Sequence, residues 1–244
     1  MKAAGDLFGH TQGMFFQQLF QGMHLVAKIL QVPSDPSSEF LEEVRQCTSS
    51  NGVLAVGTES FYALGAPGFS RPAVDRVAEL KGRSSAKPLL VLIGERSQLE
   101  SLVTSIPPWA VPLLDHFWPG PLTCIFPAKS GLPEALTGGS ETIGVRCPGD
   151  QRLLSILCVT GPLTGTSANR ANSPPLSTAQ EVLTEFGEEI DLILDSGASP
   201  GGLPSTILSL VGPPHILREG PIRSLAIQTV MAKEGVTLAD KDVG

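Results

Sequence analysis

Aromatic and positively charged residues are both scarce in this sequence. Phe, Trp and Tyr together make up 5% of the 244 residues, and 17 Lys and Arg face 24 Asp and Glu, which gives a formal net charge of −7. A protein that binds nucleic acid over its whole surface neutralises phosphates with many cations. The acidic balance therefore argues against that class, and any positive charge that contacts a ligand must be concentrated locally.

Cysteines are few, and long apolar runs are missing. Cys47, Cys124, Cys147 and Cys158 form no C-x-x-C pair, and three of them lie within apolar runs. This pattern favours reduced, buried thiols in a cytoplasmic protein over a disulfide framework or a zinc site. Since no apolar stretch approaches the roughly 20 residues that cross a bilayer, we expect no membrane partner.

Common signatures of nucleotide and metal sites are missing as well. The sequence contains no G-x-x-x-x-G-K-[ST], no G-x-G-x-x-G after an apolar run and no H-E-x-x-H. The four histidines, His10, His24, His116 and His215, are scattered along the chain. We therefore expect no metal site built by the protein, and a bound nucleotide would need a different architecture.

Glycine and proline, in contrast, are plentiful, with 26 and 21 copies, and 41% of the residues are hydrophobic. These numbers indicate many tight connections between short elements, with enough apolar surface for a core. Helical patterns alternate with strand-like runs, so we predict an α/β fold: a single domain with a twisted mixed sheet and flanking helices. The expected strands are 53–56, 88–93, 122–126, 142–147, 162–166, 191–194, 205–211 and 215–218, and the expected helices are 38–51, 72–80, 98–103, 109–117, 151–159 and 178–186.

The domain itself is expected to cover residues 32–226. Residues 1–31 mix Phe and Leu with Gln and Gly and lack the basic start of a secretory leader. We interpret them as a poorly ordered N-terminal extension or as a misassigned start, with Met14 and Met23 as alternative initiators. Residues 227–244 are expected to be a C-terminal tail.

Two short polar motifs, 86 positions apart, are the most informative local feature. Lys81-Gly82-Arg83 lies between an expected helix and strand, and Ser167-Ala168-Asn169 follows the expected strand 162–166. Alone, the first fits a basic helix end that complements the helix dipole, and the second fits an Asx- or Ser-type turn. Together they predict one cationic pocket, built from distant segments, for a ligand with phosphates and carboxylates.

Hydroxyls and cations recur at other expected strand ends. Thr58, Glu59 and Ser60 follow the strand 53–56, where open sheets usually bind ligands. The remaining residues of this kind are Thr142, Arg146, Ser205, Thr206 and Arg218. Such a recurrence is expected if a single crevice binds a polyanion, and less expected of independent surface residues.

These motifs, in this order, resemble the YrdC-like family of L-threonylcarbamoyladenylate synthases, in the short form without an extra C-terminal domain. The resemblance covers residues 38–222. Thr58-Glu59-Ser60-Phe61-Tyr62-Ala63-Leu64-Gly65 is similar to the family's P-T-[DE]-T-x-Y-G-L-G. The other matching segments are Lys81-Gly82-Arg83, Lys87-Pro88-Leu89, Trp118-Pro119-Gly120-Pro121-Leu122-Thr123, Val145-Arg146-Cys147-Pro148, Thr166-Ser167-Ala168-Asn169 and Pro204-Ser205-Thr206-Ile207.

The resemblance implies a twisted YrdC-like fold with a large positively charged cavity. It implies a nucleotidyltransferase that joins L-threonine, bicarbonate and ATP, with Mg²⁺ and no organic cofactor, into threonylcarbamoyl-AMP and pyrophosphate. Downstream tRNA threonylcarbamoyl-transferase proteins would then use this product to form threonylcarbamoyladenosine (t6A) in tRNA.

Residue roles follow from the same resemblance. The implied catalytic residues are Lys81, Arg83, Ser167 and Asn169. Thr58 and Ser60 are implied to bind L-threonine. The implied ATP-binding residues are Arg83, Lys87, Thr142, Arg146, Ser167, Ser205 and Arg218. Replacing Lys81 or Arg83 by Ala is expected to cost on the order of a few kcal/mol of transition-state stabilisation while folding stays intact.

The chain also departs from the family pattern, and other functions compete with the enzyme. Gly57, Ser60 and Ala63 replace the usual Pro, Thr and Gly, and Arg170 follows the S-x-N motif where Ser is common. A nonenzymatic paralogue that binds tRNA, rRNA or double-stranded RNA in the same concavity is the main alternative; it predicts salt-sensitive RNA affinity without turnover. The related domain of a hydrogenase-maturation protein fits less well, because that longer protein carries acylphosphatase and Cys-rich zinc segments.

Overall fold

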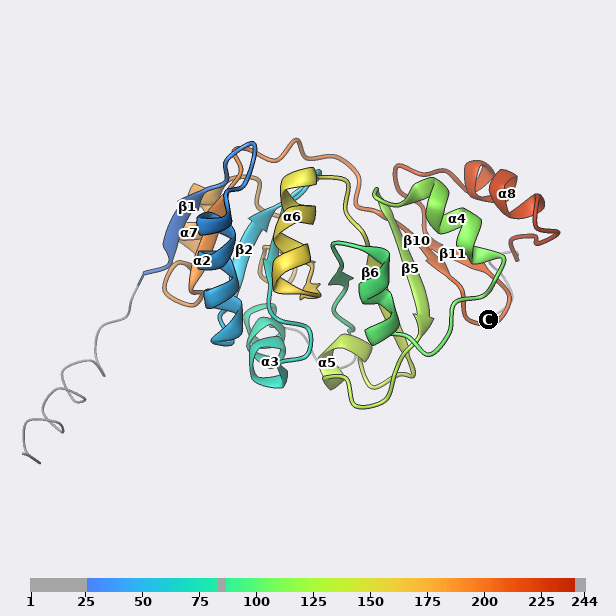
Figure 1. Ribbon diagram of the computed structural model, residues 1–244, viewed down its shortest axis with the longest axis horizontal. Helices are drawn as coiled ribbons and strands as arrows, with labels where there is room; N and C mark the ends of the chain where they lie inside the picture. The colour runs from blue at the N-terminus through green and yellow to red at the C-terminus, as the bar shows by residue number, and fades with distance from the viewer. Residues whose placement is uncertain (1–25, 83–86, 240–244) are drawn as a thin grey trace, which may run out of the picture.

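Two mixed β-sheets form the frame of the molecule. The computed structural model describes residues 26–82 and 87–239 (Figure 1). The first sheet has the strand order β1 (Lys28–Gln31), β9 (Leu192–Asp195), β2 (Leu54–Gly57), β3 (Tyr62–Gly65) and β8 (Thr166–Ser167). The second has the order β11 (His215–Arg218), β10 (Thr206–Ser209), β5 (Leu122–Pro127), β6 (Thr142–Arg146), β4 (Val91–Leu92) and β7 (Leu163–Thr164). Both sheets contain parallel and antiparallel pairs, which confirms the predicted mixed pairing, although the strands form two sheets and not the single sheet expected.

The chain passes from one sheet to the other at Gly165. β7 pairs with β4 in the second sheet, and two residues later β8 pairs with β3 in the first. The Gly165 amide donates to the Leu90 carbonyl at 2.7 Å, and a Cβ at this position would lie 2.4 Å from Leu92 Cγ. Only glycine permits this close approach, which places Ser167 at the junction of the two sheets.

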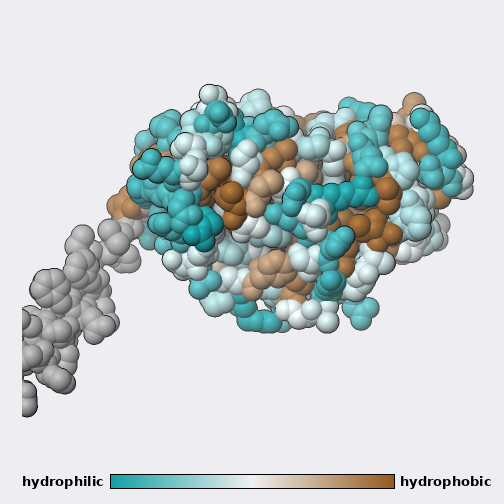
Figure 2. Space-filling model, viewed as in Figure 1, coloured by the Kyte–Doolittle hydropathy of each residue, from teal (hydrophilic) through white to brown (hydrophobic). Residues whose placement is uncertain are grey.

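Helices begin where the sequence supplies capping side chains. Ser37 caps α2 (Ser38–Ser49), Ser70 caps α3 (Arg71–Leu80), Asp150 caps α6 (Gln151–Thr160), and Thr178 forms a capping box with Glu181 at α7 (Ala179–Phe186). The other helices are η1 (Arg96–Ser101), α4 (Ala110–Phe117), α5 (Glu134–Thr137) and α8 (Ser224–Ala232). α2 packs beside α6 on one face (Figure 1), where polar side chains are interspersed with small, separate apolar patches (Figure 2). No helix in the described ranges is both long and apolar enough to span a membrane.

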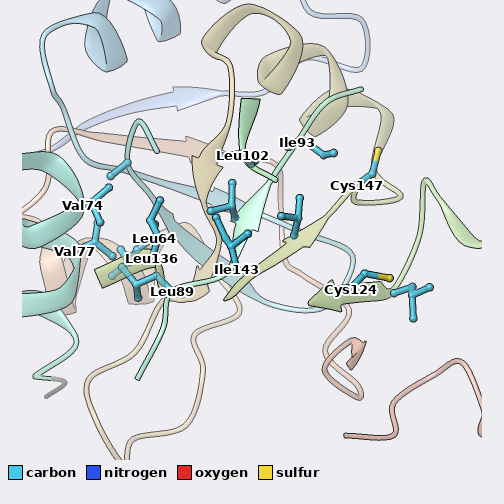
Figure 3. Packing of buried hydrophobic residues seen from close by; sticks show 14 of the residues in the cluster. Leu64, Val74, Val77, Leu89, Ile93, Leu102, Cys124, Leu136, Ile143 and Cys147 are labelled. Atoms are coloured by element: carbon cyan, nitrogen blue, oxygen red, sulfur yellow. The ribbon is translucent and has the colours of Figure 1, made fainter. Parts of the chain in front are cut away.

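One hydrophobic core links the two sheets. Leu64 of β3 and Val74 and Val77 of α3 lie beside Leu89 and Leu136, which come from the half of the molecule that holds the second sheet (Figure 3). All five side chains are fully buried. Because apolar burial of this kind drives folding without regard to sheet boundaries, both sheets are held in one body and can share a site.

The predicted domain limits need correction at both ends. Lys28–Gln31 form β1 and pair with β9, although they were assigned to the extension over residues 1–31; residues 1–25, with Met14 and Met23, lie outside the described residues. This strand is mostly exposed, so its apolar signal is weak. At the other end, α8 begins before the expected tail of residues 227–244, and Ile227 and Met231 are fully buried in the core.

The thiols differ in accessibility more than the sequence suggests. Cys124 and Cys147 are buried, Cys47 is half-buried and Cys158 is exposed, which corrects the expectation that it is buried. All four are free thiols. Burial raises the pKa of Cys47 and of Cys147 to about 11, and it raises the pKa of Cys124 further.

These differences predict the order of thiol labelling. Only the thiolate reacts, so a raised pKa lowers the reactive fraction at pH 8 and makes labelling faster as the pH rises. With an aromatic disulfide reagent, Cys158 should react first, Cys47 and Cys147 slowly, and Cys124 only on unfolding. Mass spectrometry of partly labelled protein measures the order, with Cys158→Ser as control. Early modification of Cys124 in folded protein would contradict the packing described here.

Candidate functional site

A cavity of about 290 Å³ lies between the two sheets. The turn between β2 and β3 and strand β8 supply one wall, and the second sheet supplies the other. Among the described residues that line it, two are arginines and none is acidic. Its polar lining residues are Thr58, Ser60, Tyr62, Thr123, Arg146, Thr166, Ser167, Ser205 and Arg218.

The two polar motifs meet through the side chain of Lys81. This residue follows α3 and is 1% exposed. Its Nζ donates to the Ser167 carbonyl at 2.6 Å, to the Asn169 carbonyl at 2.6 Å and to Asn169 Oδ1 at 2.5 Å. Segments 86 positions apart in the sequence are therefore joined directly, as the sequence predicts. Arg83, the other cation of the first motif, lies outside the described residues.

The cluster presents Ser167, rather than Lys81, to the cavity. Ser167 is among the lining residues, whereas Lys81 and Asn169 are not. Ser167 Oγ donates to Asn169 Oδ1 at 2.7 Å, and Asn169 Nδ2 donates to the Ser173 carbonyl at 2.6 Å. Lys81 and Asn169 thus hold the turn that carries Ser167. This position also changes the expectation that Lys81→Ala leaves folding intact, because the substitution would leave buried acceptors without their donor.

Arg170 also anchors this turn. Its guanidinium pairs with Glu185 at 3.0 Å and with Glu189, and it lies 4.7 Å from the ring centre of Phe186. Nη1 also donates to the Leu80 carbonyl, at the end of α3, at 3.4 Å. The departure from the family pattern at this position thus has a structural role, since Arg170 connects the turn to α3 and α7.

Replacing Arg170 by Ala should therefore reduce stability moderately. The Arg170 side chain is 37% exposed, so solvent screening limits its ion pairs, and we expect a loss of about 1 kcal/mol in the free energy of unfolding. Urea unfolding measures it. Arg45→Ala is the matched control, because Arg45 pairs with Glu42 within α2 on the surface, and it should cost less. Equal midpoints for Arg170→Ala and the unmodified chain would contradict this role.

The turn after β2 forms a small hydroxyl cluster. Thr58 Oγ1 donates to the Phe61 carbonyl at 2.7 Å, accepts from the Ser60 amide at 3.2 Å and lies 3.2 Å from Ser60 Oγ. Both Thr58 and Ser60 line the cavity. Before the turn, a Cβ at Gly57 would lie 2.1 Å from Ser196 Oγ, so the departure at this position allows the segment after β9 to pack closely.

Two arginines reach the cavity from the second sheet. The Arg146 side chain is 7% exposed, its Nε donates to the Gly120 carbonyl at 3.0 Å, and its Nη2 pairs with Glu59. Arg218 donates through Nε and Nη2 to the Ser205 carbonyl at 3.2 and 3.0 Å. Burial, and then the charge of Arg146, lower the pKa of Arg218. Two cations that repel each other in a partly buried space favour a bound anion between them.

Ser205 and Thr206 support the Arg218 side of the cavity. Ser205 Oγ lies 2.8 Å from Thr123 Oγ1, and both residues are lining residues. Thr206, fully buried, donates to the Ile222 carbonyl at 2.7 Å and accepts from the Gly220 amide at 2.9 Å. Ser205 is thus placed at the site, whereas Thr206 fastens the segment that follows β11.

Other residues named from the sequence lie apart from the cavity lining. Thr142 begins β6 at the opposite end from Arg146, and its Oγ1 lies 3.0 Å from Ser140 Oγ. Lys87 is exposed, although the next residue, Pro88, is a lining residue. In the part of the chain that the structure describes, no group of three His, Cys, Asp or Glu side chains could hold a metal ion.

Sequence reasoning gave no role to three polar residues that line the cavity, which are Tyr62, Thr123 and Thr166. It placed Glu59 at a strand end, and the structure pairs this residue with Arg146 behind the cavity. Each lies within a motif that matches the family pattern, so the neighbouring residues of that motif were the available signal.

A G-x-S-x-G sequence, typical of hydrolases, occurs at Gly197-Ala198-Ser199-Pro200-Gly201. In the structure it forms a loop between β9 and β10, whereas the nucleophile of a hydrolase lies on a strand-to-helix turn.

Comparisons with known proteins show to which family the chain is similar. The Sua5/YciO/YrdC family model, described as Telomere recombination, matches residues 46–220. A threonylcarbamoyl-AMP synthase of Pyrococcus abyssi is 36% identical over 183 residues, which cover 74% of this chain and 54% of that protein. The chain thus spans about half the length of this relative and of a Bacillus subtilis one. A Coxiella burnetii threonylcarbamoyl-AMP synthase is 33% identical over 71% of this chain and 94% of its own length.

Solved structures show the same fold. Sua5 of Pyrococcus abyssi complexed with L-threonine superposes with a TM-score of 0.80 at 31% identity, over 87% of this chain and 63% of that one. The matched segment, 46–220, contains Lys81, both residues of the S-x-N turn and both cavity arginines. The fold and the extent of the match together establish that this chain belongs to the Sua5/YciO/YrdC family.

Proposed function

We propose that this chain is an L-threonylcarbamoyladenylate synthase, which forms threonylcarbamoyl-AMP and pyrophosphate from L-threonine, bicarbonate and ATP. The observation that carries the proposal is the cavity between the sheets, whose described lining includes Arg146 and Arg218 and no acidic residue. The names of the relatives, and the L-threonine in one similar structure, support the choice of substrates.

The reaction brings two anions together. Bicarbonate takes up a proton and loses water to give carbon dioxide. The threonine amine adds to carbon dioxide, loses a proton and becomes a carbamate. A carbamate oxygen then attacks the α-phosphorus of ATP, the bond to the bridging oxygen of the β-phosphate breaks, and pyrophosphate leaves. Fixed cations offset the repulsion between carbamate and phosphates, and alignment of the attacking and leaving oxygens supplies much of the remaining rate enhancement.

The described residues divide into binding and positioning groups under this proposal. Arg146 and Arg218 face the phosphates, Ser205 and Ser167 offer hydroxyls to ATP or the intermediate, and Thr58 and Ser60 bind threonine. Lys81 and Asn169 act by holding the turn that carries Ser167. Arg83, Lys87 and Thr142 remain proposed ATP contacts on the family resemblance alone.

Magnesium enters with the nucleotide in this proposal. Mg²⁺ retains several waters and is commonly held by substrate phosphates with only one or two protein ligands. The described cavity lining offers hydroxyls and no carboxylate, so it fits a metal that ATP carries better than one that the protein holds. The product would pass, in the cytoplasm, to tRNA threonylcarbamoyl-transferase proteins, because a mixed carbamic-phosphoric anhydride is an activated acyl donor that water hydrolyses slowly enough to be detected.

A turnover assay tests the proposal directly. Purified protein is incubated with ATP, Mg²⁺, bicarbonate and L-threonine, and released pyrophosphate is measured together with the mass of the adenylate. We expect pyrophosphate only when bicarbonate and threonine are both present. Salt-sensitive tRNA binding without any pyrophosphate release would instead support the RNA-binding alternative.

A further inference from the structure

Glu59 lies at the tip of the β2–β3 turn, between two residues that line the cavity. Thr58 and Ser60 face the cavity, whereas Glu59 is not a lining residue. Its Oε1 accepts from Arg146 Nη2 and from the Gly149 amide, the latter at 2.8 Å. Both partners belong to the segment at the end of β6, so this side chain bridges the turn of the first sheet to the second sheet.

The bridge is well shielded from solvent. The side chains of Glu59 and Arg146 are 27% and 7% exposed. Glu59 Oε2 is inaccessible to solvent and has no hydrogen-bond partner among the described residues. A shielded ion pair with one unsatisfied oxygen is weak evidence for stability, because desolvation offsets much of the attraction. Its geometry instead suits positioning, since the carboxylate fixes where the Arg146 guanidinium lies.

From this geometry we infer that Glu59 is a positioning residue that couples the two substrate subsites. The inference rests on the proposed function, in which the Thr58–Ser60 turn binds threonine and Arg146 faces ATP. Threonine that orders the turn also fixes Glu59, and Glu59 in turn holds Arg146 in place for the nucleotide. By thermodynamic linkage, ATP must then favour threonine binding by the same factor.

A second contact leaves the same turn and could carry coupling instead. The Ser60 carbonyl accepts from the Gly201 amide at 2.8 Å, which connects the turn to the loop between β9 and β10. That connection is made by backbone atoms and persists when the side chain at position 59 changes. Substitution of Glu59 therefore separates the two routes.

The test measures threonine affinity by calorimetry with and without the Mg²⁺ complex of an ATP analogue that has a methylene between its α- and β-phosphates. In the unmodified chain the analogue should tighten threonine binding by roughly 5- to 150-fold, the usual range of allosteric coupling. In Glu59→Ala the factor should fall to about twofold or less. Glu59→Gln keeps an acceptor for the Gly149 amide but loses the charge that holds Arg146, so it should give an intermediate factor.

Asp150→Ala is the matched control. Asp150 pairs with Arg152 at 2.8 Å at the start of α6, with side chains 19% and 32% exposed, and neither residue is among the lining residues of the cavity. It should lower stability and leave the coupling factor unchanged.

Each outcome has a distinct meaning. A protein that binds neither threonine nor the analogue contradicts the proposed function itself. Binding of both without coupling in the unmodified chain, or with equal coupling in Glu59→Ala, overturns the role of Glu59 while the proposed function stands. If Glu59→Ala does not fold, Glu59→Gln decides by the same criterion.

Discussion

Lys81→Met should unfold at markedly lower denaturant concentration and lose at least about 100-fold in kcat/KM, because one side chain supports both the fold and the site. The ammonium donates to three described acceptors in the Ser167–Asn169 turn. Met fills a similar volume but donates no hydrogen bond. A buried carbonyl left unsatisfied costs about 1–3 kcal/mol, so a total loss of about 3 kcal/mol is expected after the desolvation of the charge is recovered.

The loss of activity has a different origin from the loss of stability. Lys81 is not a lining residue, so its removal acts by letting Ser167 move, and a displacement of about 1 Å at a reacting centre can cost about 100-fold in rate. Urea unfolding and pyrophosphate release at a temperature where the variant stays folded measure the two effects separately. Lys233→Met, at an exposed lysine, is the control and should change neither. A stable, fully active Lys81→Met would show that the turn holds its shape without this ammonium.

Much of this site could be predicted from the sequence, because local chemistry marks it. Lys81-Gly82-Arg83 and Ser167-Ala168-Asn169 each combine polar side chains with a boundary between apolar elements, and the structure joins them by direct hydrogen bonds. Residue types could not reveal that Lys81 lies behind the turn instead of facing the ligand. The burial of the Lys81 side chain depends on how α3 packs on the rest of the protein, which the local sequence does not determine.

The sequence predicted the strands themselves better than it predicted which end of each strand borders the cavity. Thr142 and Arg146 lie at opposite ends of β6, about 13 Å apart at about 3.3 Å per residue, yet the sequence offers both as ATP contacts. In a mixed sheet, neighbouring strands run in both directions, so the sequence does not indicate which end of a strand faces a ligand. The pairing of β6 with β5 and β4, together with the residues that line the cavity, shows that the Arg146 end of β6 borders it.

Alternation along the turn explains why Glu59 was not assigned a role. Thr58 and Ser60 point into the cavity and Glu59 points away, so the three residues of one motif serve two walls. β3 (Tyr62–Gly65) was also not predicted, because this strand has four residues and they were interpreted as the end of a site motif. The tightness of such turns depends on distant partners, here Arg146 and the Gly149 amide.

Arg146→Ala is expected to give the largest loss of activity, about 100- to 1000-fold in kcat/KM, the range seen when one preorganised donor to a developing charge is removed. The guanidinium is almost fully buried and is held by the Gly120 carbonyl and Glu59, so it needs little reorganisation when the phosphate charge shifts. Arg146→Lys keeps the charge but loses the planar fork, and it should recover only part of the rate. Pyrophosphate release under single-turnover conditions measures the chemical step.

A double-mutant cycle distinguishes this role from a general loss of packing. If Glu59 affects the rate by holding Arg146, the Glu59→Ala and Arg146→Ala effects on kcat/KM should not add, and the double variant should resemble Arg146→Ala alone. The free energy of unfolding should follow a different pattern. Arg146→Ala leaves the partly shielded Glu59 carboxylate unpaired, so the double variant should be at least as stable as Arg146→Ala. Arg152→Ala, which breaks a neighbouring ion pair outside the cavity lining, is the control for electrostatic change near the site. Strictly additive rate losses would mean that the two residues act independently. Full activity of Arg146→Ala would show that this guanidinium has no role in the reaction.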